Sequence, residues 1–179
     1  FAHAWMAKRC GDNTAEHLGR LTLNPFSHAD LIGTFVLPIM GILSGWAMFG
    51  WAKPVPVNPR NLRDPKTHMF WVAAAGPLSN ILLAFVGGIL LVVVSRTVQA
   101  SETAMALGEM LTFFIFINIL LALFNLIPLH PLDGGKILER FIPASANRWL
   151  EENQMTLNII LIGLFITGGF HFLAEPARQ

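Results

Sequence analysis

The sequence has few charged residues, and this shortage indicates the class of protein. Only 13% of the 179 residues are Asp, Glu, Lys or Arg, while 54% are hydrophobic. A soluble globular domain usually carries about a quarter charged residues. None of these charged residues occurs in Met69–Ser95, Met110–Leu132 or Asn153–Ala174. Each stretch can cross a hydrocarbon core of about 30 Å, which takes roughly 20 helical residues. The composition excludes an ordinary soluble domain and predicts a polytopic membrane protein.

Other absences exclude further classes. The net charge is only +1, and no basic stripe is interleaved with aromatic residues, so nucleic acid is not an expected partner. The single cysteine, Cys10, cannot form an internal disulfide and leaves the redox compartment open. The chain starts at Phe1, with neither Met nor a signal peptide, and we expect it to be a fragment or a processed chain.

Apolar and polar segments alternate along the chain. We expect residues 1–8 to be the end of a helix, and the polar, turn-rich residues 9–30 to be a surface loop. The predicted transmembrane helices are 69–94, 104–127 and 155–173. We therefore expect an all-α membrane protein, a polytopic helical bundle that forms one domain over residues 1–179.

Basic residues indicate the orientation in the membrane. They gather in three polar segments, whereas the connection at 95–103 holds only Arg96 and Glu102 as charged residues. Positively charged loops usually stay in the cytoplasm. On this rule, residues 69–94 run outward and residues 104–127 run back. The basic residues concerned are Lys8, Arg9, Arg20, Lys53, Arg60, Arg63, Lys66, Lys136, Arg140 and Arg148.

Segment 31–52 is uncharged but interrupted by glycines and by Pro38. If the segments on both its sides are cytoplasmic, it cannot cross the membrane once. We expect a re-entrant element or a pair of short half-spans, since broken backbone at membrane depth is tolerated where it is buried in protein or lines a wet cavity. The alternative is one ordinary span with a weaker charge signal.

Two ionisable residues at the edges of apolar segments, His3 and Asp133, are candidates for chemistry, because such groups are costly in a membrane and usually functional. Taken alone, a histidine on an apolar helix is more often a packing residue than a ligand. Asp133 before Gly134 is more often a turn or a helix cap than a metal site. On the topology above, both lie near the cytoplasmic face on different elements, where they could converge on one ion.

Two longer motifs are more specific than a lone His or Asp. The chain contains Asn125-x-x-Pro128-x-x-x-x-Asp133-Gly134 and Ala75-Gly76-Pro77-Leu78-Ser79-Asn80. The first resembles the N-x-x-P-x-x-x-x-D-G motif of site-2 proteases, the M50-type intramembrane zinc metalloproteases, and the second resembles the A-G-P-x-x-N helix start of that family. Phe1-Ala2-His3 resembles the end of its H-E-x-x-H motif. Residues 21–25 and 50–61 are similar to a compact prokaryotic branch. The likeness covers nearly the whole chain in the expected order.

The resemblance implies an enzyme that hydrolyses peptide bonds in or near transmembrane segments of membrane proteins. It implies a Zn²⁺ site with His3 and Asp133 as ligands, facing the cytoplasmic side of the inner or plasma membrane. The first His and the Glu that acts as general base are expected immediately before Phe1. We therefore expect no catalytic residue in the chain as given, and no activity from it alone. The sequence makes no prediction of the oligomeric state.

Other polar residues carry weaker hypotheses. Asn80 and Asn125 could hydrogen-bond the substrate backbone or orient a ligand, and helix–helix contact is the alternative for both. His28 and Asp30 could gate the site or bind a second ion, although a surface turn is the more ordinary interpretation. His130 lies between prolines that we expect to turn it away from Asp133.

Two other functions remain as alternatives. A catalytically inactive relative would bind membrane helices as a scaffold or regulator, and the natural sequence upstream of Phe1 distinguishes it from the protease. A small transporter would have broken helices and polar groups along a solute path. It would also show pseudo-symmetry between two halves, and the sequence has none that we detect.

Overall fold

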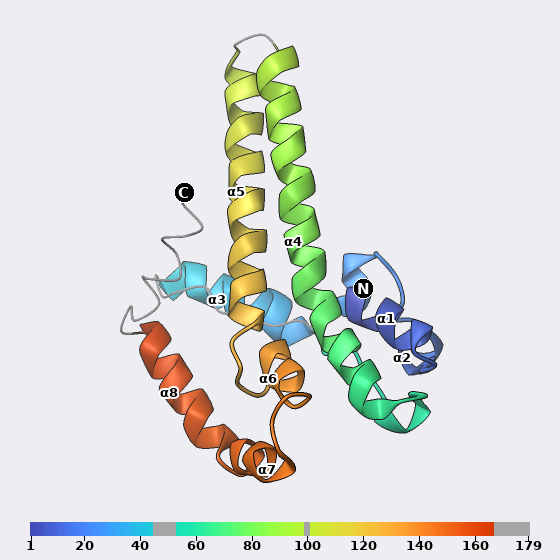
Figure 1. Cartoon of the computed structure of the whole chain (residues 1–179). Coiled ribbons are helices and arrows are strands. Elements are labelled where there is room, and N and C mark those ends of the chain that lie inside the picture. The colour runs from blue at the N-terminus through green and yellow to red at the C-terminus, as the bar shows by residue number, and fades with distance from the viewer. Residues whose placement is uncertain (45–52, 99–100, 167–179) are drawn as a thin grey trace. The chain divides into compact units, whose positions relative to one another are not determined.

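The computed structural model describes residues 1–44, 53–98 and 101–166, and these form two units, residues 1–72 and 73–179. Every regular element in the described ranges is a helix and none is a strand, which confirms the all-α class for that part of the chain (Figure 1). The elements are α1 (Ala2–Arg9), α2 (Thr14–His17), the 3₁₀ turn η1 (Pro25–His28), the π-helical turn η2 (Leu31–Val36), α3 (Leu37–Ser44), the 3₁₀ turn η3 (Pro59–Asn61), α4 (Pro65–Thr97), α5 (Glu102–Asn125), α6 (Asp133–Leu138), α7 (Ala144–Glu152) and α8 (Gln154–Ile166).

Helix α1 has one buried and one exposed face. Ala4 and Ala7 are almost fully buried, and Cys10 follows on the same side at helical spacing. Trp5 and Arg9 lie on the exposed face, where the Arg9 guanidinium carbon is 4.7 Å from the Trp5 ring centre. The small side chains on the buried face let a neighbouring backbone approach α1 closely.

That neighbour is the segment from residue 58 to residue 72, which runs antiparallel to α1 and the turn after it. The His3 ring is hydrogen-bonded to the Val72 carbonyl, and the Arg63 backbone N–H donates to the Cys10 carbonyl at 3.3 Å. Next to these, the Asn61 carbonyl lies against Gly11, whose φ of 107° suits glycine. Residue numbers in the contacting pairs rise along α1 and fall along its partner segment. The two segments therefore form one antiparallel contact within the first unit.

The segment predicted to be a broken membrane element begins with a side-chain cap. The Asp30 carboxylate accepts hydrogen bonds from the backbone N–H groups of Ile32 and Gly33, and η2 then leads into α3. The chain leaves at His28 and returns at Lys53, whose N–H donates to the His28 carbonyl at 2.9 Å. Residues 45–52 of the predicted element lie outside the described residues.

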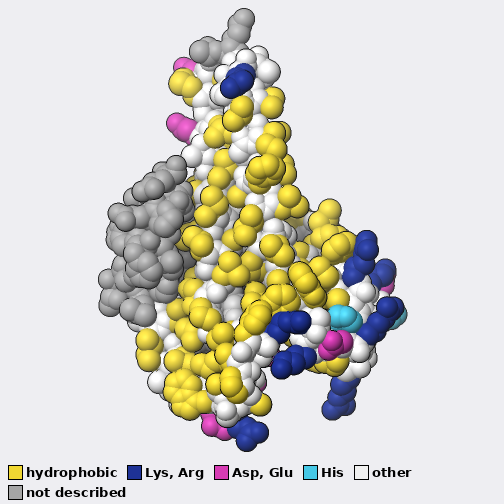
Figure 2. All heavy atoms as spheres, viewed as in Figure 1, with side chains coloured by type: hydrophobic (Ala, Val, Ile, Leu, Met, Phe, Trp, Pro, Cys, Tyr) yellow, Lys and Arg dark blue, Asp and Glu magenta, His cyan; other side chains and the backbone are white. Residues whose placement is uncertain are grey.

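Helices α4 and α5 are long and apolar, as the uncharged stretches predict. Asp64 caps the start of α4 by accepting from the Thr67 N–H, and Ser101 caps α5 by accepting from the Ala104 N–H. Only 11% of the most apolar window of each helix is buried, whereas the core helix of a soluble protein is mostly buried. Figure 2 shows hydrophobic side chains covering the visible face of this pair. By length and composition, both could cross a membrane.

The two long helices pack closely at one glycine. Gly87 of α4 is buried, and a Cβ atom added to it would lie 3.0 Å from both Phe114 and Ile115 of α5. Gly88, the next residue, has no heavy atom within 4 Å of such a Cβ. Gly87 is therefore a contact point between α4 and α5, and Gly88 is not.

The structure refines the predicted boundaries. Helix α4 begins before the predicted span 69–94 and ends after it, and α5 nearly coincides with 104–127. Helix α8 covers the first part of 155–173, and the residues after Ile166 lie outside the described part. The predicted surface loop at residues 9–30 includes the short helical elements α2 and η1, and Asp12 within it is fully buried.

We predict that Gly87→Val destabilises the protein by about 1–3 kcal/mol, because the new side chain overpacks the contact with α5. Gly88→Val is the matched control and should cost less, since it meets open space. Thermal unfolding in detergent measures both. Equal effects at the two positions would contradict a close contact at Gly87.

Candidate metal centre

His3 is held in a defined orientation on the buried face of α1. Its Nδ1 atom lies 2.8 Å from the carbonyl oxygen of Val72 in α4. A carbonyl oxygen only accepts, so Nδ1 must carry the proton of this bond. In the neutral ring, Nε2 is then the nitrogen with the lone pair. Histidines that bind metals are commonly oriented in this way, with the second nitrogen donating to a backbone carbonyl or a carboxylate. The donor chemistry of His3 therefore fits a zinc ligand.

Asp133 is the first residue of α6 and is placed by the two glycines that follow it. Both Gly134 and Gly135 are buried. A Cβ atom on Gly134 would overlap the carbonyl oxygens of Leu126 and Ile127, and one on Gly135 would lie 2.9 Å from the His130 backbone nitrogen. The first turn of α6 thus rests directly on the backbone that follows α5, and this contact fixes the position of Asp133.

His130, in the turn before α6, lies close to a carboxylate. Its Nε2 atom lies 3.1 Å from the Glu139 carboxylate, and the His130 side chain is only 11% exposed. This contact joins the turn before α6 to the residue just after it. It is consistent with the expectation that His130 points away from Asp133 to another partner.

The two candidate ligands belong to different units, His3 to residues 1–72 and Asp133 to residues 73–179, and each is described within its own unit. Among residues 1–44, 53–98 and 101–166, no three or more His, Cys, Asp or Glu side chains gather in a group that could hold a metal ion. His3 and Asp133 therefore stay predicted ligands.

The carboxylate of Asp12 accepts hydrogen bonds on both of its oxygens. Its Oδ1 accepts from the Thr14 backbone N–H at 3.0 Å, from the Thr14 hydroxyl, and from the Asn61 side-chain amide at 3.0 Å. Its Oδ2 accepts from the Asn58 backbone N–H at 2.7 Å. We call Asp12, Thr14, Asn58 and Asn61 the Asp12 cluster.

Sequence reasoning missed the Asp12 cluster. Asp12 follows Gly11 and precedes Asn13, a composition typical of exposed turns, yet it has no exposed surface. Burial alone raises the pKa of Asp12, but the hydrogen bonds from Thr14, Asn61 and Asn58 together lower it below its ordinary value. The sequence signal that could have found the cluster is the pair Asn58 and Asn61, two polar residues in the Pro-rich segment to which the sequence analysis gave no role.

His28 and Asp30 serve the backbone around them. His28 Nε2 lies 3.0 Å from the Thr22 carbonyl oxygen, and Asp30 caps η2. Both roles are those of residues in a turn. The geometry therefore favours the turn interpretation over a second ion site.

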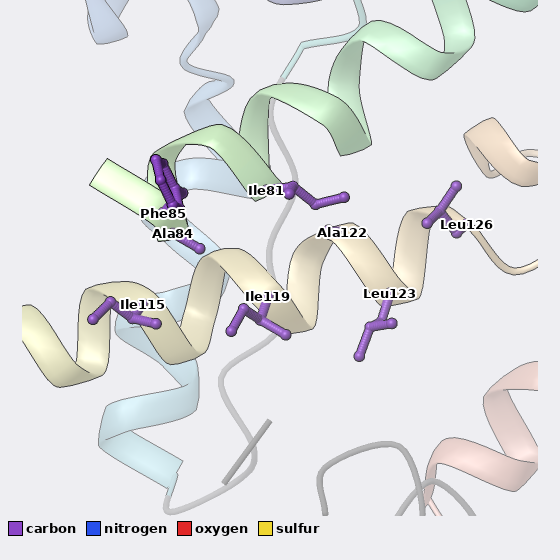
Figure 3. Close-up of a pocket in the computed structure, with 8 residues that line it drawn as sticks. All are labelled: Ile81, Ala84, Phe85, Ile115, Ile119, Ala122, Leu123 and Leu126. Carbon is purple, nitrogen blue, oxygen red and sulfur yellow. The ribbon is translucent and has the colours of Figure 1, made fainter. Parts of the chain in front are cut away.

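Asn80 lies in the middle of α4, and Asn125 is the last residue of α5. Their neighbours Ile81 and Leu126 line one groove of about 320 Å³ between these helices (Figure 3). Its lining is entirely apolar, so the groove suits hydrocarbon groups and not the chemistry itself. The lining residues are Ile81, Ala84, Phe85, Ile115, Ile119, Ala122, Leu123 and Leu126. Whether the asparagines contact a substrate stays a prediction.

Comparisons with known proteins identify the class. The family described as "Peptidase family M50" matches residues 94–168. A Bacillus subtilis protein named "Putative zinc metalloprotease YwhC" is 39% identical over 168 residues, which are 93% of this chain and 74% of that protein. Proteins named "Putative zinc metalloprotease Rip2" from Mycolicibacterium smegmatis and Mycobacterium tuberculosis are each 29% identical, over 93% of this chain and 61% of their own length. No solved structure matches.

The chain belongs to peptidase family M50, the site-2 protease family, and has prokaryotic relatives. This membership confirms the resemblance drawn from the Asn125–Gly134 and Ala75–Asn80 motifs, and it supports a metalloprotease. The chain spans about three quarters of the B. subtilis relative and about three fifths of the mycobacterial ones.

We predict that Gly134→Ala displaces the first turn of α6 and destabilises the protein by about 1–3 kcal/mol or more, because the added methyl overlaps main-chain oxygens that cannot move independently. Gly163→Ala in α8 is the control, since its Cβ meets open space. Thermal unfolding in detergent compares them. If the two variants unfold at the same temperature, the turn is not tightly packed at Gly134.

We also predict that Asp12 makes stability depend on pH. Because its pKa is lower in the folded state than in the unfolded state, the carboxylate stabilises the fold fully above pH about 4 and loses this effect as the pH falls through the folded-state pKa. Asp12→Asn should cost about 1–3 kcal/mol near pH 7. The difference between wild type and variant should shrink below pH about 4. Unfolding midpoints measured from neutral to acidic pH test this, and a difference that does not change with pH would refute it.

Proposed function

We propose that this chain is the membrane-embedded core of an intramembrane zinc metalloprotease, which cleaves transmembrane or membrane-associated protein substrates. His3 and Asp133 are two of its zinc ligands, and the remaining His and the general-base Glu precede Phe1 in the intact protein. The orientation of His3 by the Val72 carbonyl is the observation that carries the proposal, because it leaves Nε2 as the nitrogen able to bind a metal.

Membership of family M50 supports the zinc chemistry, and the relatives' names describe zinc metalloproteases. When bound, zinc acts as a Lewis acid toward water and toward the peptide carbonyl. The residues of this chain supply ligands and their orientation. The His3 ring is fixed through Nδ1, and Asp133 is fixed by the contact of α6 with the preceding backbone.

A membrane location is supported by the surfaces of α4 and α5. Their most apolar windows are mostly exposed, and large exposed apolar surfaces usually mark contact with a partner or with lipid. Apolar side chains are also largely exposed in and before α3. They are Leu31 in η2 and Ile42 and Leu43 in α3. We infer multi-pass insertion in the cell membrane, with the site towards the cytoplasm as the basic segments indicate.

The re-entrant character of residues 31–52 is part of the same proposal. It is supported by the hydrogen bond between Lys53 and the His28 carbonyl, because a segment whose two flanks touch cannot have them on opposite sides of a bilayer. Such an element could present an edge or wall beside the site. A transmembrane substrate would have to unwind there, since its helix hides the peptide carbonyls in internal hydrogen bonds.

The test is zinc content by elemental analysis of the full-length protein, extended upstream of Phe1. We expect about one zinc per chain, as a catalytic site with three protein ligands holds. Changes to residues that hydrogen-bond to a metal ligand typically lower metal affinity 10–100-fold. Asp133→Asn changes a proposed ligand itself and should lower zinc affinity by more than this. Asp30→Asn is the matched control and should keep its zinc, since Asp30 caps a helix and Asn caps equally well.

Two results would overturn the proposal. One is a coding sequence without His-Glu immediately before Phe1. The other is a full-length protein that holds no zinc after purification in zinc-containing buffer. Either would favour the inactive relative that binds membrane helices.

A further inference from the structure

We propose that Asp12 is a positioning residue, which fixes α1, and with it the imidazole of His3, against the segment at residues 58–72. The inference rests on the proposed function in treating His3 as a zinc ligand. The Asp12 cluster and the His3–Val72 hydrogen bond are independent observations at the two ends of one contact.

The first argument is the burial of the carboxylate. Asp12 has no exposed surface, and a buried charge is costly unless hydrogen-bond donors surround it. Local donors are insufficient, because Thr14 bonds only to Oδ1. The donor to Oδ2 is Asn58, 46 residues away, and Asn61 adds a second distant donor to Oδ1. The carboxylate is therefore satisfied only when segment 58–61 lies against the end of α1.

The second argument is the length of the contact. Helix α1 has eight residues and so is about 12 Å long, with Asp12 just beyond its end and His3 near its start. Both α1 and α4 are helices, which transmit a displacement along their axes. A shift of α1 by one residue is about 1.5 Å, enough to break a hydrogen bond of 2.8 Å between His3 and Val72.

The third argument concerns the residues between His3 and Asp12, which do little to fix the axial position of α1. The buried residues of α1 are the small residues Ala4 and Ala7, and Cys10 follows them. Small side chains allow close approach, but they do not interlock and so do not fix the axial position. The directional bonds are those of Asp12, together with the Arg63 N–H to the Cys10 carbonyl. Asp12 is thus the side chain that determines where along the segment α1 sits.

The experiment uses the full-length protein and its Asp12→Asn variant, which keeps the size of the side chain but replaces one acceptor by a donor. Three quantities are measured: the zinc dissociation constant by competition with a chelator, the nitrogen NMR signals of the His3 ring in the metal-free protein, and the unfolding temperature. A His3→Gln variant assigns the signals. We expect a 10–100-fold weaker zinc affinity, as for other residues that orient a ligand. We also expect loss of the Nδ1-protonated signature of His3.

Matched variants of Thr14 separate positioning from general destabilisation. Thr14→Val removes the hydroxyl donor to Asp12, and with it an acceptor of Asn61, and should act in the same direction as Asp12→Asn with a smaller effect. It keeps the test possible if Asp12→Asn does not fold. Thr14→Ser keeps the hydroxyl and should keep the wild-type zinc affinity and His3 signal. Asp30→Asn is the control for the same chemical change away from the cluster.

The outcomes are distinct. If Asp12→Asn or Thr14→Val lowers the unfolding temperature while zinc affinity and the His3 signal stay at wild-type values, Asp12 has only a structural role and the inference is wrong. If the wild type itself binds no zinc, the proposed function fails. The inference is then decided by the His3 signal of the metal-free protein alone. A change in Asp12→Asn or Thr14→Val that Thr14→Ser does not show supports the inference, and an unchanged signal overturns it.

Discussion

A buried carboxylate must find its hydrogen-bond donors in the protein. For Asp12 these donors come from two parts of the chain that are far apart in the sequence. Thr14 lies beside Asp12 in the sequence, whereas Asn58 and Asn61 follow the uncharged segment 31–52. The order of the first unit depends on this requirement. The chain after residue 53 must return to the end of α1, and α4 then begins next to it and runs back along α1 toward His3.

The sequence predicts the long helices well and this contact poorly, for a physical reason. Uncharged stretches of more than 20 residues have few alternatives to a membrane helix, so α4 and α5 follow from composition alone. The burial of Asp12 depends on partners 46 and 49 residues away, and nothing next to it distinguishes it from an exposed turn. For Asp30 the sequence favours a surface turn, but it does not show that the aspartate caps the helical element that follows.

The candidate ligands were predictable as residue types but not in the way they are held. His3 and Asp133 follow from the family motifs, which the membership of family M50 confirms at the level of the family. The bond from the His3 ring to the Val72 carbonyl has no sequence signal, because any residue at position 72 supplies a carbonyl. The Asp-Gly-Gly run does contain a signal. Neither glycine has a positive φ, so their role is close main-chain contact and not an unusual turn.

Both candidate ligands are therefore positioned by main-chain atoms of, or next to, the two long helices. The carbonyl of Val72 in α4 orients His3, and the carbonyls of Leu126 and Ile127, just after α5, leave room only for glycine behind Asp133. Main-chain oxygens in and beside a helix move less than side chains, since each helical residue is tied to the next turn. Under the proposed function, the long helices contribute apolar surface to the membrane and fixed carbonyl oxygens to the site. The ligands themselves then lie on the short elements α1 and α6, outside the stretches that composition requires to be apolar.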